Sequence, residues 1–329
     1  MTAIAPSRGW PVALAGAVAV PFVLSTPFFL RTATVALVFV ALAVAYDLVV
    51  GRVGALSLAQ PVFYAFGAYA AAILAVKGGN PGVWVELLVA VVGAIALALF
   101  IGIPSFRLSQ YTFAIGTLGF ALIAQLVALN WVGMTGGPLC ISPVPGIEVP
   151  LGTSRIVVAQ GVGYYWIALG LAAATVAGIH LLSRSRTGGA ITAVRDDPVL
   201  AAARGLWPLR LRLLVFGIAA GVSAVAGVFT AHFQRVVCPT QVEFPTTILL
   251  LIMVFLGGRA SLRGVTAAAL VFSIVPQVLR ITNEWRMVIF GLLLLVAVTS
   301  FPDGIEHIYA ALDRRRKRRA TAGAAADRT

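Results

Sequence analysis

The sequence predicts an all-α polytopic membrane protein, and three observations lead to this fold class. Of the 329 residues, 60% are hydrophobic and only 11% are charged, whereas a soluble domain carries about 25% charged residues. The mean hydropathy of the chain is +1.00. Long uncharged runs rich in Ala, Leu, Val and Gly recur from end to end. Because a backbone in lipid must satisfy its own hydrogen bonds, this composition favours helices over a barrel.

Ten of these runs are candidates for crossing a bilayer. A span needs about 20 apolar residues, since about 30 Å of hydrocarbon is crossed at about 1.5 Å per residue. We therefore predict about ten transmembrane helices in one domain, residues 1–312, followed by a basic tail, 313–329. The first run is interpreted as a retained helix because no clear cleavage site follows it. The weakest run could instead be a broken or re-entrant helix. The predicted spans are 11–30, 32–50, 53–76, 83–104, 111–132, 163–182, 213–232, 244–257 (the weakest), 264–280 and 287–301.

The distribution of basic residues predicts the orientation. If the N-terminus is cytoplasmic, eighteen of the 24 Lys and Arg residues fall on the cytoplasmic side, six of them in "RRRKRR", residues 314–319. Such a bias is typical of cytoplasmic loops. Both termini and the loop 183–212 are then cytoplasmic, and the loop 133–162 is the main extracytoplasmic segment. The net charge of +13 does not indicate nucleic-acid binding, because the basic clusters flank apolar spans.

The sequence contains no motif for nucleotide binding by a phosphate-binding loop and no motif for metal binding. Neither lysine, Lys77 or Lys317, follows the glycine pattern of a phosphate-binding loop. Three scattered histidines and two cysteines make no recognisable metal-binding pattern. We therefore expect no catalytic residue, no metal and no cofactor bound by this chain.

The most polar stretch of the chain is the loop 183–212. Asp196, Asp197 and Pro198 give it a helix start, an alanine run follows, and Gly205 provides a stop. The sequence therefore predicts a short helix at the cytoplasmic membrane surface. The alternative is a solvated loop whose arginines only fix the topology.

This loop, "SRTGGAITAVRDDPVLAAARGL", resembles the cytoplasmic coupling loop of the branched-chain amino acid permease family of ABC importers. Other segments resemble the same family in the same order, among them "VVGRVGALSLAQPVFYAFGAY" and "LLIMVFLGGRASLRGVTAAAL". The resemblance extends over residues 35–306. It points to the paralogue with the arginine-aspartate loop, which usually pairs with a second, similar permease.

The resemblance implies a set of partners and an interface. Two ATP-binding subunits, which would carry ATP and Mg, a second permease subunit (a paralogue or a second copy) and an extracytoplasmic substrate-binding protein are expected, in a bacterial plasma membrane. The family usually has glutamates within the stretch 200–204, where this chain has none, so specific salt bridges to the ATPase are in doubt. The residues expected at the ATPase-coupling interface are Arg195, Asp196, Asp197, Ala201, Ala202, Arg204 and Gly205.

A translocation path is suggested by polar residues within uncharged spans, because these are costly unless satisfied. Ser57, Gln60 and Tyr64 share one predicted helix face, and Thr117 and Gln125, eight residues apart, share another. The alternative is that these side chains only join helices through hydrogen bonds. Two further path residues, Gly136 and Gly137, match the glycine turn of the family at the outer mouth.

Four other residues invite a specific expectation. Cys140 and Cys238 both fall outside, where a disulfide could form, although two unpaired thiols are favoured. Glu86 lies near the outer end of its span and is expected to reach water. Asp47 lies near an inner end, where an ion pair with Arg52 or another inner-surface role is favoured over substrate binding.

Three functions compete at this stage. The favoured one is a permease subunit of a binding-protein-dependent ABC importer for branched-chain or related amino acids, which works by alternating access. The alternative is an ion-coupled secondary transporter of small polar solutes. That mechanism usually needs buried ionisable groups in mid-span, and the central portions of the ten spans contain none. A third class is a structural or assembly protein, which would need no lined path.

Overall fold

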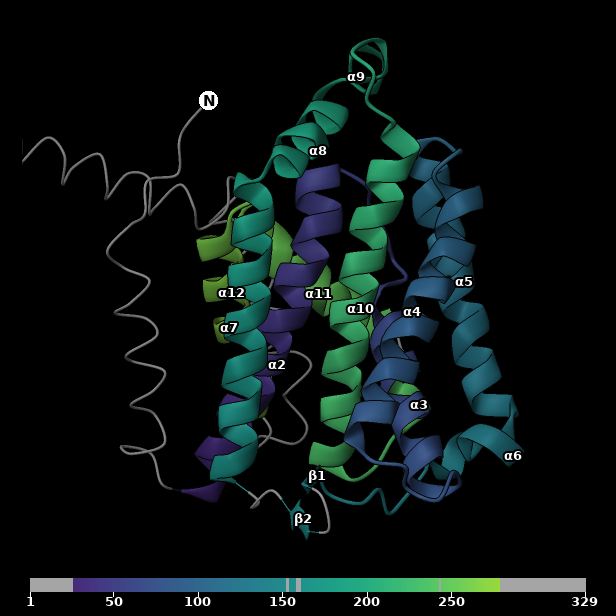
Figure 1. Cartoon of the computed structure of the whole chain (residues 1–329), viewed down its shortest axis with the longest axis vertical. Coiled ribbons are helices and arrows are strands. Elements are labelled where there is room, and N and C mark those ends of the chain that lie inside the picture. The colour runs from purple at the N-terminus through teal and green to yellow at the C-terminus, as the bar shows by residue number, and fades with distance from the viewer. Residues whose placement is uncertain (1–25, 152–153, 158–160, 243, 279–329) are drawn as a thin grey trace, which may run out of the picture.

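The computed structural model describes residues 26–151, 154–157, 161–242 and 244–278. Over these residues the chain folds into a bundle of roughly parallel helices (Figure 1). In chain order its elements are α2 (Pro27–Asp47), the π-helix η1 (Leu48–Val53), α3 (Gln60–Val76), α4 (Val83–Ser105), α5 (Gln110–Asn130), α6 (Val132–Thr135), the 3₁₀-helix η2 (Gly137–Leu139), β1 (Glu148–Leu151), β2 (Ser154–Val157), α7 (Val162–Arg184), α8 (Arg186–Asp196), α9 (Pro198–Ala203), α10 (Pro208–Gln234), the 3₁₀-helix η3 (Pro239–Val242), α11 (Phe244–Gly257) and α12 (Leu262–Val278).

The bundle has two central helices and an apolar surround. The span Pro27–Val53 and α10 are mostly buried, whereas most residues of α4, α5 and α7 are partly buried or exposed. These five spans are long and apolar enough to cross a membrane, and α3, α11 and α12 are shorter apolar helices. An apolar helix face exposed on the bundle is suited to lipid or to another membrane subunit. The predicted all-α membrane architecture is therefore confirmed.

Small residues bring α3 and α10 into close contact. A Cβ on Gly67 would collide with the backbone of Ala224, and one on Gly227 would collide with the backbone of Tyr64. Without a hydrophobic driving force between helices in lipid, such close backbone approach is a main source of packing energy. Nearby, the ring of Phe216 meets Phe63 edge-on at 5.2 Å between centroids, so aromatic packing adds to this contact.

The predicted spans correspond to helices wherever the structure describes them, with three differences. The predicted boundary at Arg31 is wrong, because α2 begins at Pro27 and continues through that residue. The predicted span 53–76 is interrupted, since residues 54–59 are not helical and α3 begins only at Gln60. The weakest span forms a continuous short helix, α11. Most of the predicted span 11–30, all of 287–301 and the tail 313–329 lie outside the described residues.

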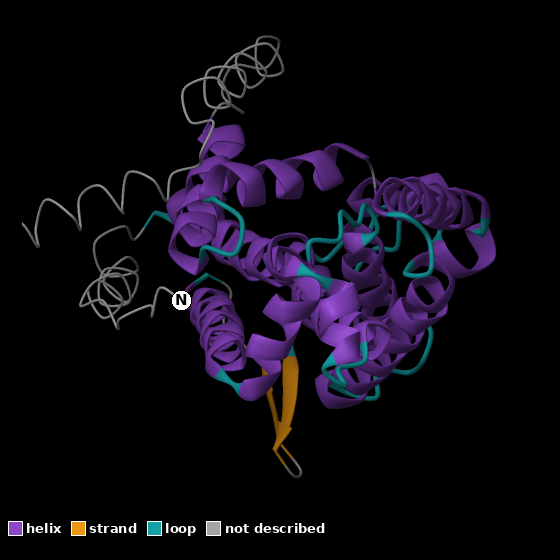
Figure 2. Cartoon of the chain, turned by 90° about the horizontal axis from the view of Figure 1, so that it is seen from above, coloured by secondary structure: helices purple, strands orange, loops and turns teal. Residues whose placement is uncertain are grey.

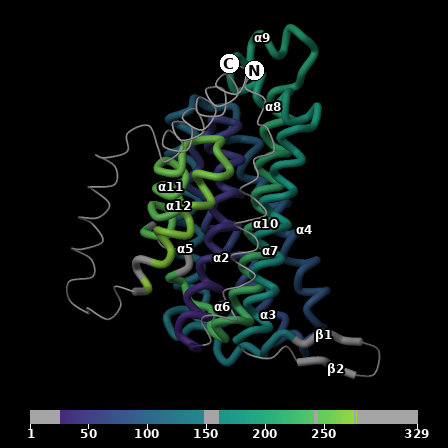
Figure 3. The backbone as a smooth tube through the Cα atoms, turned by 90° about the vertical axis from the view of Figure 1, so that its left-hand side faces the viewer, coloured from purple at the N-terminus to yellow at the C-terminus, as the bar shows by residue number. Residues whose placement is uncertain are grey.

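Contacts between loops place them at two opposite ends of the bundle. At one end, near α8 and α9, the Arg52 guanidinium donates to the Ser183 hydroxyl. At the other end, Lys77 Nζ donates to the Gly133 carbonyl at 2.7 Å, and residues 140 and 238 are joined. Figure 3 shows α8 and α9 at one end and the strands at the other. The loops thus lie at the two ends as predicted, with 183–212 at the end opposite to 133–162. The assignment of the α8–α9 end to the cytoplasm stays a prediction.

The loop 133–162 contains the two strands that the structure describes. Strands β1 and β2 pair antiparallel, with Glu148 opposite Val157 and Leu151 opposite Ser154. The hairpin projects from the bundle (Figure 2). From the sequence we predicted this loop as the main extracytoplasmic segment, without strands.

Candidate functional site

The polar loop 183–212 folds into two short helices, α8 and α9, which meet at Asp197. The Asp197 backbone is extended, and its carboxylate accepts hydrogen bonds from the Val199 and Leu200 amides at 2.9 and 3.0 Å. Pro198 occupies the first helical position, where a missing amide costs nothing. Gly205, at φ +81°, ends α9 in the left-handed region that glycine tolerates. The predicted short helix is therefore present, with narrower bounds than the sequence suggested.

The predicted interface residues are divided between these two helices. Arg195 and Asp196 belong to the last turn of α8, and the alanine run forms α9. Ala201 is buried, whereas Ala202 and Arg204 are exposed. Beside them Val199 and Leu200 are 78% and 50% exposed. The tip of the loop lies beyond the end of the helix bundle (Figure 1) and exposes apolar side chains, which is typical of a surface that another protein covers.

The base of this loop is anchored to the rest of the bundle. Ser185 caps α8 by accepting from the Gly188 amide at 3.2 Å. A Cβ on Gly54 would lie 3.3 Å from Cγ of Arg195, so this side chain lies against the turn that follows η1. The tip is exposed, but its base touches the chain that leads toward α3.

The polar residues predicted to line a path lie in packed surroundings. Gln60 is fully buried, and its amide donates to the Ala219 carbonyl at 3.3 Å and the Ser223 hydroxyl at 2.6 Å on α10. Thr117 is also fully buried and accepts from the Leu58 amide at 3.0 Å. Ser57 and Tyr64 are buried too, whereas Gln125 is half-buried.

One premise of that prediction is wrong. Ser57 is not on α3, because it belongs to the non-helical residues 54–59, so only Gln60 and Tyr64 share a helix face. The Ser57 carbonyl accepts from the Tyr46 hydroxyl at 2.5 Å. The hydrogen bonds of these residues connect α2, α3, α5 and α10 around the non-helical segment 54–59. A path beside them stays a prediction.

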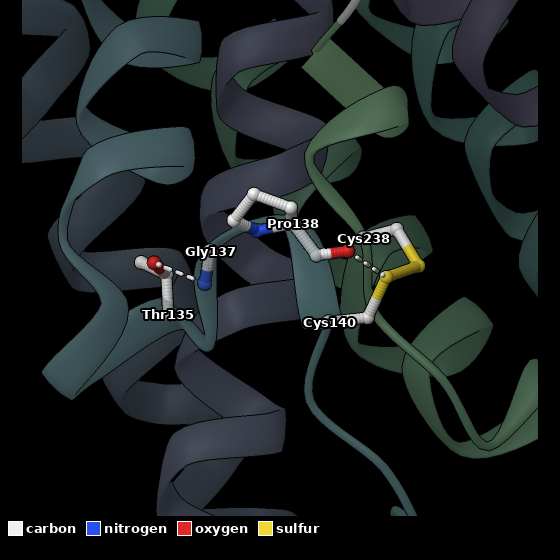
Figure 4. Close-up of a disulfide and its surroundings, with 5 residues drawn as sticks. All are labelled: Thr135, Gly137, Pro138, Cys140 and Cys238. Carbon is white, nitrogen blue, oxygen red and sulfur yellow. Dashed lines mark hydrogen bonds between the residues drawn. A yellow bond between two sulfur atoms is a disulfide. The ribbon is translucent and has the colours of Figure 1, made fainter.

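Gly136 and Gly137 form the predicted turn, after α6. Both have positive φ values, +76° and +54°, and a Cβ on Gly136 would collide with the Cys140 carbonyl. The Thr135 hydroxyl accepts from the Gly137 amide at 3.3 Å and donates to the Ala128 carbonyl at 2.8 Å. Figure 4 shows this turn beside the cysteine pair. Only glycine fits this turn, so it shapes the segment that follows.

The segment after the glycine turn is linked covalently and by hydrogen bonds to the residues that follow α10. We call residues 132–147 together with 235–238 the outer cap. Cys140 and Cys238 form a disulfide with their Cα atoms 4.5 Å apart (Figure 4). The favoured prediction of two unpaired thiols was wrong, because the fold brings together residues that are 98 positions apart. Backbone bonds between Ile141 and Val237, at 2.9 and 3.1 Å, continue the connection.

A buried acid-base pair lies beneath the outer cap. Glu86 on α4 is fully buried, and its Oε2 lies 2.6 Å from Nε2 of His232 on α10, which is 3% exposed. The expectation that Glu86 reaches water was therefore wrong. Nδ1 of His232 donates to the Pro145 carbonyl at 2.9 Å, because a carbonyl can only accept. The pair therefore joins two membrane helices to the outer cap. Sequence reasoning missed it because the two residues are 146 positions apart.

Asp47 also lies deeper than its position near a span end suggested. Its side chain is fully buried, and Oδ1 accepts from the Ala260 amide at 2.8 Å. A Cβ on Gly51 would collide with this carboxylate. The residue therefore connects the end of α2 to the turn between α11 and α12. Its role at the inner surface stays a prediction.

Over the described ranges no group of three or more His, Cys, Asp or Glu side chains could hold a metal ion. The main features of the described bundle are the exposed tip of the α8–α9 loop at one end, the disulfide-linked outer cap at the other end, and α10, which runs between them.

Comparison with known proteins gives this arrangement its context. Residues 28–298 match the protein-family model described as "Branched-chain amino acid transport system / permease component". The chain is similar to the high-affinity branched-chain amino acid transport system permease protein LivM of Escherichia coli, with 32% identity over 308 residues that cover 88% of this chain and 72% of that protein. It is also similar to the Escherichia coli protein LivH of the same description, with 26% identity over 80% of this chain and 89% of that protein. A probable branched-chain amino acid transport permease protein LivM of Methanocaldococcus jannaschii is 24% identical over 67% of this chain and 66% of that protein. No solved structure matches the chain.

Proposed function

Because the chain belongs to the family of branched-chain amino acid transport system permease components, we propose that it is a membrane-spanning subunit of a binding-protein-dependent ABC importer. Its cargo is a branched-chain or related amino acid, which moves by alternating access. Two ATP-binding subunits, which hold the ATP and Mg, drive the cycle from the cytoplasm. An extracytoplasmic binding protein delivers the cargo, and the complex resides in a bacterial plasma membrane.

The observation that carries this proposal is the exposed tip of the α8–α9 loop. Val199 and Leu200 are apolar yet exposed at the end of the bundle where a soluble subunit can reach them. Asp197 and Gly205 fix the ends of α9, so the tip has a defined shape before any partner binds. The surface that we assign to the ATPase also includes Arg195, Asp196, Ala202 and Arg204, which are exposed. Ala201 was predicted to belong to it, but this residue is buried within the loop.

A second permease subunit has a suitable place on α5. This helix is the least buried of the five long spans. A Cβ on Gly116 or Gly119 would meet nothing within 4 Å, so the helix presents small residues on an open face. Such faces allow close approach of another membrane helix. Relatives of both the LivM and the LivH description are consistent with a pair of permeases, which we propose enclose the path between them.

The path itself is proposed to pass the two groups of polar residues. Gln125 is half-buried on the α5 face. The wall of the proposed path is held together by the buried residues Ser57, Gln60, Tyr64 and Thr117. The outer mouth of the path is shaped by Gly136 and Gly137. An ion-coupled transporter is disfavoured, because the buried pair Glu86 and His232 lies beneath the outer cap and not at mid-span.

The test is co-purification of the ATP-binding subunits with the chain from a mild detergent. In the Val199→Glu/Leu200→Glu variant we expect recovery of the ATPase to fall on the order of tenfold or more, equivalent to about 1.4 kcal/mol of lost binding. The control is Leu139→Glu, which alters a leucine that is 85% exposed in the outer cap and should leave recovery unchanged. Absence of any ATPase with the intact chain would refute the proposal.

A further inference from the structure

The structure points to residues 54–59 as a moving wall of the cytoplasmic half of the translocation path. We propose that this non-helical segment borders a water-filled passage and changes position when the α8–α9 loop is driven by the ATPase. The inference rests on the proposed function and adds to it a specific gating segment. Three observations support it: the position of the segment at membrane depth, the partial exposure of its non-helical backbone, and its contact with Arg195.

The segment lies at membrane depth. Its first residue, Gly54, lies against Arg195 at the α8–α9 end. Its far end leads into Gln60, which bonds to Ala219 and Ser223 of α10. Those two residues are about 17–22 Å from the start of a helix about 40 Å long, at 1.5 Å per residue. The segment therefore runs from the loop end to the middle of the bundle, and α3 occupies only the other half (Figure 1).

A non-helical backbone at this depth cannot face lipid. In the hydrocarbon region such segments occur only where protein buries them or where they line water. Side chains from two helices, α2 and α5, satisfy part of the backbone. Gln110 Nε2 donates to the Gly54 carbonyl at 3.0 Å, Tyr46 donates to the Ser57 carbonyl, and Thr117 accepts from the Leu58 amide.

Protein buries only part of the segment, namely Ser57 and Ala59. Gly54, Ala55, Leu56 and Leu58 are all partly exposed. At the deep end, Oε1 of Gln60 is buried and has no hydrogen-bond partner among the described residues, although a buried amide oxygen is costly to leave without one. A passage that holds water on this side satisfies the exposed backbone, whereas the buried Oε1 of Gln60 is out of reach of that water in this structure. Its carbonyl and amide oxygens are acceptors suited to an ammonium group in transit.

The contact with Arg195 connects this wall to the proposed ATPase interface. Gly54 adopts φ +77°, which only glycine accepts without strain. Arg195 belongs to the last turn of α8, directly before the Asp197 break. A displacement of α8 therefore reaches Gly54 first, and the segment transmits it toward Gln60. Short non-helical stretches with a glycine at one end are suited to absorbing such a change.

Accessibility of single cysteines tests this inference. Both native cysteines are in the disulfide, so an introduced cysteine is the only free thiol. Leu56→Cys and Leu58→Cys would be treated, in the complete complex in inside-out vesicles, with a charged, membrane-impermeant methanethiosulfonate reagent. The control is Phe100→Cys, which lies at similar depth on α4 and is 68% exposed on the apolar surface. If Leu56→Cys fails to fold, Ala55→Cys replaces it with a smaller change.

We expect the segment cysteines to react at least about tenfold faster than the Phe100→Cys control, because only a hydrated thiol ionises readily. Trapping the ATPases with a non-hydrolysable nucleotide should change the rate severalfold at residues 56 and 58 and leave the control unchanged. Equal, slow rates at all positions in a complex that retains its ATPase would overturn the inference and leave the proposed function intact. Fast labelling that does not change with the nucleotide would refute the proposed movement of the segment. Loss of the ATPase from the intact complex would instead count against the proposed function.

Discussion

The two ends of the bundle are built in opposite ways. The outer cap is closed by a disulfide, a backbone bridge and the contact of the Glu86–His232 pair with Pro145. The α8–α9 tip is shaped mainly by local capping groups and leaves apolar side chains exposed. The cap is held by contacts within this chain, although it also exposes Leu139, whereas the tip is the surface that we propose the ATPase buries. In the proposed function, the cap end holds the helices in place while the ATPase displaces the tip.

Helix α10 connects the two ends directly. It begins at Pro208, shortly after α9, and ends at Gln234, between His232 and Cys238. Along its length it packs closely on α3 and α4. A rigid helix of this kind, fixed at the outer cap and displaced at the tip, would pivot about the cap. The first two experiments below weaken the cap and the third weakens the tip.

Removing the acid of the buried pair should have the largest effect. Glu86→Ala leaves the His232 ring buried without its partner, and breaking a buried pair in this way costs about 3–5 kcal/mol. We expect the apparent thermal midpoint of the purified chain to fall by about 5–10 °C, measured by the fraction that elutes as a monodisperse species after heating.

Glu86→Gln is the matched control for this variant. Its side-chain amide can donate to Nε2 of a neutral His232 while Nδ1 still donates to Pro145. We expect less than about half of the alanine effect, because the hydrogen bond replaces the ion pair. Equal losses in the two variants would show that the charge, and not the connection to the cap, is what matters.

Opening the disulfide should have a smaller effect. Replacing Cys140 and Cys238 with serine frees a loop of about 98 residues. In the chain-entropy view this costs typically about 2–4 kcal/mol, and we expect the lower end of that range because membrane-inserted helices limit the unfolded chain. The same thermal assay should show a shift of about 5 °C. A reductant should reproduce the shift in the native chain and have no further effect in the double variant.

The predictable parts of this structure are those set by local sequence. Uncharged runs predicted the described helices, because burial in lipid allows little else. The start of α9 followed from Asp197 and Pro198, and its end from Gly205, since capping depends on neighbouring residues only. The break before Gln60 had local signals, a glycine at 54 and a proline at 61, but the uncharged run concealed it.

The parts that sequence reasoning missed depend on distant contacts. Nothing near Glu86 indicates that a histidine on α10 lies 2.6 Å away, and a charged residue at a span end ordinarily reaches water. Likewise the cysteine pair depends on how the cap folds over the end of α10, which spacing along the chain does not specify. Ser57 and Gln60 were identified as notable polar residues, but their partners on α2 and α10 became evident only from the three-dimensional arrangement.

Weakening the tip should change stability least and function most specifically. Asp197→Ala removes the side chain that caps α9, which costs about 1 kcal/mol of local helix stability. Because α9 is only six residues long, this loss should fray the helix and lower ATPase co-purification severalfold, with a shift in thermal midpoint of at most about 3 °C. Asp196→Ala removes the same charge from the neighbouring exposed residue but no cap, and Asp197→Asn keeps a capping oxygen. If both controls behave like Asp197→Ala, negative charge governs the docking; if only the alanine at 197 fails, the shape of α9 does.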